Sequence, residues 1–211
     1  TAVGDDALRN TTTGTGNAAI GALALTANTT ANYNTGCGYK SLYSNTTGAE
    51  NTGIGRAALE DNTTGSSNVA VGNHCLRNNT TADNNTAVGH DALAANTTGY
   101  GQVAIGANAG SSLTTGEQNV AVGHGALATC TTGKVNTCVG RSAGNVVTTA
   151  HFNTFVGGDS GRVCTTGASN TALGNDTLYD LTTGSNNVCI GGGGFGETNG
   201  AGGNITTGSD N

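Results

Sequence analysis

The sequence predicts an all-β protein, a parallel β-solenoid (β-roll) of twelve 17-residue coils, and three observations support this prediction. Glycine recurs at every seventeenth residue from Gly4 to Gly191 without an insertion. A Thr-Thr pair recurs with the same spacing, beginning at Thr12-Thr13. The 211 residues include 37 glycines, no proline and only 9% charged residues, a composition that is typical of disorder unless a strict repeat supplies order. We therefore expect one elongated domain over residues 1–211, with a longer irregular coil at 187–210.

One repeat reads Asn-Thr-Ala-Val-Gly-x-x-Ala-Leu-x-x-Asn-Thr-Thr-Gly-x-x, with position 1 at Asn17, Asn34 and each seventeenth residue after them. Positions 1 to 5 are expected to form a strand, and the Thr-Thr pair at positions 13 and 14 a second short strand. Position 4 is aliphatic in eleven of twelve coils, and position 2 is mostly β-branched. Alternation along a strand places positions 2 and 4 on one face, which we expect to line the coil interior.

Position 3 lies on the opposite face of the predicted strand and is a small residue in nearly every coil. A face turned to water is expected to carry a charged side chain somewhere in twelve copies, and this face carries none. Strands that are apolar on both faces are generally buried on both. We therefore expect Ala70, Ala87, Ala104 and Ala121 to form a subunit interface with another copy of the chain.

Asparagine opens ten of the eleven repeats that start within the chain, and Gln102 opens the other. This column predicts a structural ladder in which each amide bonds to the next coil, as stacked in-register strands favour. A carbohydrate-binding row of amides is the alternative. The ten ladder residues are Asn17, Asn34, Asn51, Asn68, Asn85, Asn119, Asn136, Asn153, Asn170 and Asn187.

The six cysteines are expected to be free thiols that fill small apolar spaces in the core. Successive coils of a parallel solenoid are ~4.8 Å apart, so cysteines of one column separated by two or three coils are too distant to bridge. Cys130 and Cys138, eight residues apart, are the one pair that could meet across a coil.

Two further patterns recur with the repeat: a set of N-glycosylation sequons, and an exchange of side-chain size between positions 9 and 12. The Asn-Thr-Thr triplets form N-glycosylation sequons between Asn10 and Asn96, but the repeat itself generates them. Leucine at position 9 accompanies asparagine at position 12 in several coils, and where position 9 is glycine, position 12 is apolar. We expect the two side chains to compete for one interior volume. The glycine coils pair Gly110 with Leu113, Gly144 with Val147 and Gly161 with Cys164.

Composition and spacing argue against several classes of function. Seven Lys and Arg residues and a net charge of −6 supply no basic stripe for nucleic acid. No apolar run reaches the ~20 residues of a membrane span. The four histidines have no fixed Cys, His or carboxylate partner at metal-binding spacing. We therefore expect no enzyme activity, no metal, no cofactor and no nucleic-acid partner. The chain begins without Met and in mid-repeat, which suggests a piece of a longer protein.

Variation is concentrated at positions 6, 7, 16 and 17, which carry nearly all the charge and most aromatic residues. In repeat proteins such variable turns are the usual recognition surface. The largest aromatic departure from the repeat is the group His151, Phe152 and Phe155, which we interpret as a contact patch. A plug that fills a gap between subunits is the alternative interpretation of the same residues.

The unit Asn85-Thr86-Ala87-Val88-Gly89-His90-Asp91-Ala92-Leu93, followed by Asn96-Thr97-Thr98-Gly99, resembles repeats of bacteriophage tail-fibre proteins. It is also similar, more distantly, to the head repeats of trimeric autotransporter adhesins. The resemblance covers all twelve coils and implies a left-handed β-roll assembled as a homotrimer. The adhesin repeat is shorter, and neither a stalk coiled coil nor a chaperone domain is present in these residues.

These features favour a structural and adhesive segment of an extracellular fibre, on a virion or a cell surface. The expected partners are other copies of the chain and a host-surface carbohydrate. A subunit of an extracellular filament that stacks end to end is the alternative. A threonine-rich ice-binding solenoid comes third, because the two adjacent threonines of each coil point in opposite directions.

Overall fold

The computed structural model describes residues 1–193, 201–202 and 206–208. Twelve short parallel strands stack in chain order into a single sheet, and no helix occurs among the described residues. The strands are β1 (Ala2–Val3), β2 (Ala18–Ile20), β3 (Thr35–Cys37), β4 (Thr52–Ile54), β5 (Val69–Val71), β6 (Thr86–Val88), β7 (Val103–Ile105), β8 (Val120–Val122), β9 (Thr137–Val139), β10 (Thr154–Val156), β11 (Thr171–Leu173) and β12 (Val188–Ile190).

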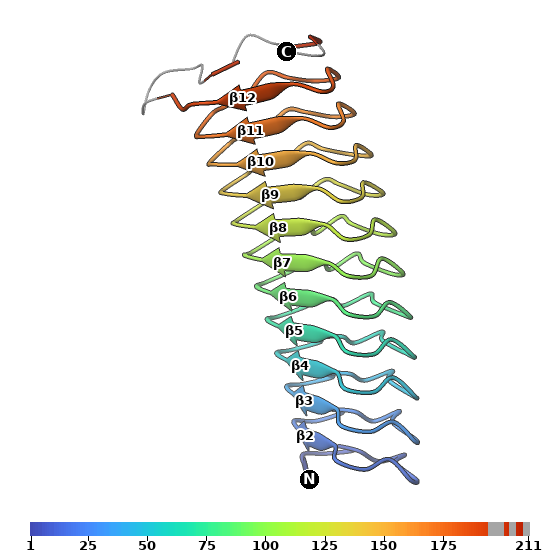
Figure 1. Cartoon of the computed structure of the whole chain (residues 1–211). Coiled ribbons are helices and arrows are strands. Elements are labelled where there is room, and N and C mark those ends of the chain that lie inside the picture. The colour runs from blue at the N-terminus through green and yellow to red at the C-terminus, as the bar shows by residue number, and fades with distance from the viewer. Residues whose placement is uncertain (194–200, 203–205, 209–211) are drawn as a thin grey trace.

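Each strand pairs with the next in perfect repeat register, so that a residue lies beside the residue seventeen positions later. Ala87 of β6, for example, lies beside Ala104 of β7. Figure 1 shows the result, a rod in which the strands stack along one side and the connecting turns project away from them. The chain is therefore the parallel β-solenoid that the glycine period predicts.

The strand faces are the reverse of those expected from the sequence. Ala104, at position 3, is fully buried, whereas Ile105, at position 4, is 42% exposed. The coil interior is thin, because leucines at position 9 already fill the space behind the sheet. A β-carbon built on Gly36 would lie 3.3 Å from Leu25 Cδ1, so a side chain at position 3 must be small where position 9 is leucine. Positions 2 and 4 consequently point outward.

This reversal corrects the predicted subunit interface. Ala70, Ala87, Ala104 and Ala121 belong to the core of the chain itself, where they are at most 1% exposed. They pack with leucines such as Leu76 in one continuous cluster that runs along the rod. The absence of charge at position 3 therefore reflects burial within each coil and not contact with a second subunit.

The Thr-Thr pair forms no second strand in the part of the chain that the structure describes. It does form a hydrogen-bonded ladder. The Thr63 N–H donates to the Thr80 carbonyl oxygen at 2.9 Å, and the Thr63 hydroxyl donates to the same oxygen at 2.9 Å. Position-13 side chains are mostly half-buried, whereas every position-14 threonine is exposed.

Glycine at position 5 is required by the corner that ends each strand. Gly89 has a φ of 136°, and a β-carbon built there would lie 2.5 Å from the Gly106 carbonyl oxygen of the next coil. An L-residue is disfavoured at this position by both its backbone conformation and the close approach of the next coil. The unbroken glycine column is thus explained by the backbone geometry of the stack.

The C-terminal coil departs from the repeat. Most of the irregular part of the expected 187–210 coil lies outside the described residues. The flanking residues resume the pattern, since the Thr182 N–H donates to the Thr206 carbonyl oxygen at 2.8 Å. Asn187 Nδ2 likewise donates to the Gly208 carbonyl oxygen at 2.7 Å.

Candidate functional site

The most distinctive surface of the rod is the outward face of its sheet, formed by the side chains at positions 2 and 4 of every coil. We call it the outer face. It carries threonine, valine, isoleucine, leucine, one alanine and one cysteine, and no charged residue in any coil. The large aliphatic residues exposed on it are Val3, Ile20, Ile54, Val69, Val88, Ile105, Leu173, Val188 and Ile190. An uncharged, exposed face of this length needs an explanation, because isolated surface aliphatics are ordinary but aligned ones are not.

The outer face is large as well as uncharged. Twelve strands spaced ~4.8 Å apart give two parallel rows of β-branched side chains over roughly 55 Å. With a width of ~10 Å, the face covers on the order of 500 Å², which is near the upper end for the largest apolar patch of a soluble monomer. In-register pairing keeps both rows continuous, as in β6 and β7. The face is therefore suited to contact with another extended, regular surface.

Charged side chains border the outer face on both sides. The turn that leads into each strand holds positions 16 and 17, and we call this side the entry edge. The turn that leaves each strand holds positions 6 and 7, and we call this side the exit edge. Glu50 and Asp83 are exposed on the entry edge, and Arg56 and His90 are exposed on the exit edge.

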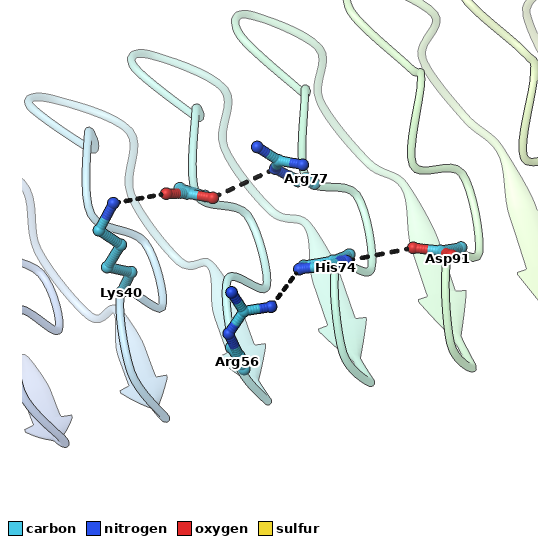
Figure 2. Close-up of polar contacts among 6 residues, drawn as sticks. Lys40, Arg56, His74, Arg77 and Asp91 are labelled. Carbon is cyan, nitrogen blue, oxygen red and sulfur yellow. Dashed lines mark hydrogen bonds and ion pairs between the residues drawn. The ribbon is translucent and has the colours of Figure 1, made fainter.

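Two groups of polar contacts link successive coils at the exit edge and the turn beyond it (Figure 2). In the first, Lys40 Nζ lies 3.2 Å from Glu60 Oε1, and Arg77 Nε lies 3.2 Å from Glu60 Oε2. The hydrogen bond with Glu60 raises the pKa of Lys40 above its ordinary value of 10.5. These contacts join three coils and keep the Lys40 ammonium charged.

The second group runs from Arg56 through His74 to Asp91 (Figure 2). Arg56 donates to His74 Nε2 at 2.6 Å, and His74 Nδ1 lies 3.5 Å from Asp91 Oδ1. An arginine can only donate, so His74 Nε2 accepts and its proton resides on Nδ1, facing the carboxylate. The Asp-His pair resembles half of a catalytic triad, but Arg56 occupies the nitrogen that would receive a proton. We interpret the group as a structural link between coils.

No cluster of three His, Cys, Asp or Glu residues that could hold a metal ion occurs among the described residues. Those residues also contain no helix that could cross a membrane. The ionisable side chains are instead spread over the turns in pairs and short chains, such as Lys134 with Glu117.

The predicted contact patch is divided by the structure. Phe152 is 61% exposed and His151 is half-buried, but Phe155 is fully buried. Phe155 occupies position 3, which faces the interior, and its ring fills the volume left by Gly144 and Gly161. The inclusion of Phe155 in a contact patch is therefore wrong. It is a plug, but one that fills a gap inside its own chain and not between subunits.

His151 also has a structural contact of its own. Its Nδ1 accepts a hydrogen bond from the Lys134 main-chain N–H at 2.9 Å. Ser66 and Ser185 do the same at equivalent places, where their hydroxyl oxygens accept from the N–H groups of Ala49 and Ala168. Position 16 is thus a site where a polar side chain caps the preceding coil.

The predicted asparagine column forms an interior ladder. The main-chain N–H of Asn34 donates to Asn17 Oδ1 at 2.9 Å, and Asn34 Nδ2 donates to the Gly48 carbonyl oxygen at 2.9 Å. The same two bonds recur along much of the rod, and Gln102 continues the column because its Oε1 accepts from the Asn119 N–H at 3.0 Å. These amides face inward and are buried, so they are not available to a carbohydrate.

A second asparagine ladder, at position 12, was not recognised from the sequence. Asn62 Nδ2 donates to Asn45 Oδ1 at 2.7 Å, and Asn79 Nδ2 donates to Asn62 Oδ1 at 2.7 Å. The same residues form sequons, yet the nitrogen that a glycan would modify is buried and hydrogen-bonded. The repetition of asparagine at a fixed period, the signal used for position 1, would have identified this column. Its members are Asn28, Asn45, Asn62, Asn79 and Asn96.

All six cysteines are free, as expected. Four of them are buried core residues, namely Cys75, Cys130, Cys138 and Cys164. Burial raises the pKa of Cys75 to about 12 and that of Cys138 well above its ordinary value. Cys37 differs, because it occupies position 4 and lies half-buried on the outer face.

Comparison of the chain with protein families, curated proteins and solved structures finds no match.

Proposed function

We propose that the chain is a structural and adhesive segment of an extracellular fibre, a homotrimer in which the outer faces of three copies pack against one another. The observation that carries the proposal is the uncharged outer face, which extends along all twelve coils while the turns beside it are charged. Burial of exposed valine, isoleucine and leucine side chains against their counterparts would supply the driving force for assembly. The tail-fibre and adhesin resemblance of the repeat contributes the threefold symmetry and the left-handed winding.

Rigid extension is the mechanical part of this function. Successive coils are tied together by sheet hydrogen bonds, by the asparagine column at position 1 and by the threonine column at position 13. Between Asn28 and Asn96 the second asparagine column adds further bonds. Opening any one coil would expose buried amides without partners, which is costly. Such a rod transmits force along its length and holds a binding surface away from its point of attachment.

Adhesion is assigned to the variable turns. Position 17 side chains are exposed in most coils and include Tyr33, Val135 and Phe152. Exposed aromatic rings beside polar side chains are suited to stacking on the apolar face of a sugar, which supports a carbohydrate of the host surface as a ligand. The location that follows is the exterior of a virion or a cell.

The outer face can be tested by sedimentation. We expect the parent protein to sediment as a trimer and Ile105→Arg to sediment as a folded monomer, because a charge on the outer face would be buried without a partner. Thr98→Arg, on an exposed threonine outside that face, is the matched control and should remain trimeric. Ala104→Arg should instead unfold the chain, because position 3 is interior. A trimeric Ile105→Arg variant would contradict the proposal.

End-to-end stacking into a filament is the alternative assembly. It would leave the outer face exposed, so Ile105→Arg would not alter the size of the particles. The same sedimentation experiment therefore separates the two arrangements.

An ice-binding solenoid is a second candidate, and one observation favours it. The adjacent threonines at positions 13 and 14 do not share a face, but position 2 threonines do share the outer face with the aliphatic side chains of position 4. Thr52 with Ile54 and Thr86 with Val88 are examples. A monomeric parent that slows the growth of ice crystals, with loss of this effect in Ile105→Arg, would favour this function over a fibre.

A further inference from the structure

We infer that the copies that meet at the outer face are parallel and level with one another, and that acidic side chains on the entry edge of one copy pair with basic side chains on the exit edge of the next. This inference rests on the proposed self-association and specifies its geometry. The observation behind it is the order in which charges flank the strands.

Three strands carry an acidic residue on the entry edge and a basic residue on the exit edge. Glu50 precedes β4 and Arg56 follows it. Asp83 precedes β6 and His90 follows it. Glu117 precedes β8 and His124 follows it. The pattern recurs at these three alternate coils. β10 has the reverse order, with His151 before it and Asp159 after it, but Asp159 is buried and forms an ion pair with Arg141.

These paired residues cannot satisfy one another within a chain. The strand and both of its corners separate the two edges, and each strand residue adds about 3.3 Å. Glu50 and Arg56, Asp83 and His90, and also His124 are exposed. On the exit edge, Arg56 contacts His74 and His90 lies 3.0 Å from Asp91. On the entry edge, Asp83 accepts the Ser66 N–H, Glu50 accepts from the Ser67 hydroxyl, and Glu117 lies 3.0 Å from Lys134. Each of these contacts stays on its own edge and none crosses the outer face, so the two edges border that face on opposite sides.

Rotation about an axis parallel to the rod brings the two edges together. Such a rotation preserves height along the rod, so the exit edge of one copy meets the entry edge of its neighbour at the same coil. Arg56 then faces Glu50 of the neighbouring copy, and His90 and His124 face its Asp83 and Glu117. One arginine–carboxylate contact and two histidine–carboxylate contacts along one seam would fix the register of a face whose apolar rows repeat every coil and could otherwise slip.

One coil carries a cation on both edges, and each cation has an acidic partner within the chain. Lys134 precedes β9 and Arg141 follows it, which would place two cations at one level. Lys134 Nζ lies 3.0 Å from Glu117 Oε1 of its own chain, and Arg141 forms an ion pair with the buried carboxylate of Asp159. Partners within the chain thus reduce the repulsion that this level would otherwise contribute.

An antiparallel arrangement of two copies would not bring acidic residues of one edge against basic residues of the other. It would place entry edge against entry edge and exit edge against exit edge. With two copies centred on β6, Asp83 would face Asp83, and Glu50 would face Glu117. Like charges at a rim oppose association, so the edges select the parallel arrangement over the antiparallel one.

Reciprocal charge reversal tests this geometry with the full chain. The entry-edge variant carries Glu50→Arg and Glu117→Arg, and the exit-edge variant carries Arg56→Glu and His124→Glu. Each alone is expected to associate at least about tenfold more weakly than the parent in sedimentation equilibrium. An equimolar mixture of the two should recover association, because each reversed edge then meets its complement. The matched control, Asp61→Arg with Asp180→Arg, makes the same charge change outside both edges and should behave as the parent.

Circular dichroism confirms that each variant is folded before sedimentation, and Glu50→Gln with Glu117→Gln replaces an entry-edge variant that does not fold, with a smaller loss expected. A monomeric parent would overturn both the proposed self-association and this inference. An associating parent whose single variants associate equally well would overturn the inference alone. Weakened variants that do not recover on mixing would also overturn it, because the two edges would then not face each other.

Discussion

Phe155 occupies the space into which a side chain at Gly161 would extend. A β-carbon built on Gly161 would lie 2.6 Å from ring carbons Cδ2 and Cε2 of Phe155, and one built on Gly144 would lie 3.1 Å from Cδ2. Position 9 is leucine in most other coils. One phenyl ring on the sheet therefore replaces the leucine side chains of two successive coils, and close packing is preserved.

This relationship predicts strong coupling between the two residues. Phe155→Ala should lower the free energy of unfolding by about 3–5 kcal/mol, because it leaves a cavity in a core that cannot collapse. Gly161→Leu should also destabilise the chain, because the new side chain collides with the ring. The double variant should recover much of the loss in urea unfolding. Losses that simply add in the double variant would show that the two positions do not share a volume.

The second ladder predicts how the chain responds to a change at its end. Asn96 Oδ1 is buried and accepts no hydrogen bond, because the next residue of its column is Leu113. An unsatisfied buried acceptor costs about 1–3 kcal/mol. Leu113→Asn would supply a donor but empty the core beside Gly110. The oxygen of the introduced amide would itself face Cys130, so the unsatisfied acceptor moves one coil further and is not removed. We therefore expect Leu113→Asn alone to destabilise the protein, and Leu113→Asn with Gly110→Leu to restore a melting temperature close to that of the parent.

Leucine is acceptable at this position despite its left-handed backbone. Gly110 has a φ of 57°, and Leu93, at the same position of the preceding coil, has a φ of 51°. The leucine column therefore bears local strain that its burial offsets. A double variant less stable than Leu113→Asn alone would indicate that the coil at Gly110 cannot bear this strain.

The thiols are predicted to react in two groups. Cys75, Cys130, Cys138 and Cys164 are buried and have raised pKa values, so they remain protonated and shielded from reagents in the folded protein. Cys37 and Cys189 are only half-buried and should react first. In the denatured, unreduced protein all six should react. A count of four or fewer under those conditions would reveal a disulfide.

Alkaline pH is predicted to destabilise the fold through the same residues. Burial raises the pKa of Cys75 from 9.0 to about 12, so the folded chain holds this proton more tightly than the unfolded chain. The associated stabilisation is complete below pH 9.0 and is lost as the pH rises toward about 12. Cys75→Ala, which introduces the residue found in the neighbouring coils at Ala58 and Ala92, should show a shallower loss of stability between about pH 9 and about pH 11. Equal slopes for variant and parent in urea unfolding would contradict this assignment.

The exposed part of the aromatic patch can be tested without disturbing the fold. His151→Ser with Phe152→Ser reproduces the Ser66-Ser67 turn, in which the Ser66 hydroxyl oxygen accepts the Ala49 N–H at 3.1 Å. The melting temperature should therefore remain close to that of the parent, while attachment to the natural surface should weaken. Equal attachment by variant and parent would remove this turn from the adhesive surface.

The sequence was sufficient to predict the fold class, but not to predict which face of the sheet points into the coil. The period of 17 residues determines the stacking, the register and the first asparagine ladder. Alternation separates positions 2 and 4 from position 3, but both sets are uncharged, and alternation alone does not say which points inward. The volume of the position-9 leucines decides it, because a residue such as Leu42 leaves room only for a small side chain beneath the strand. A β-carbon built on Gly53 would already lie 3.4 Å from Leu42 Cγ.

The error over Phe155 has the same origin. Once position 3 is taken to be outside, a phenylalanine there looks like a surface patch, and the glycines at positions 144 and 161 look unrelated to it. The pairing of one large residue with two missing leucines is visible in the sequence only when the inward face is known. The charges on the two edges likewise indicate a contact between copies only once the face between them is known to be exposed.

The constant 17-residue period of the coils before residue 187 has a consequence for how such a rod can change over time. Loss or gain of a whole 17-residue unit by recombination would keep the glycine and position-1 columns in register, so rods of different lengths would share one fold. The edge charges are different, because a copy with one extra coil between β4 and β8 would meet its shorter relatives out of step. Chains of equal length would then associate with one another in preference to chains of a different length. A longer variant could therefore form its own fibres without mixing with the shorter parent chain.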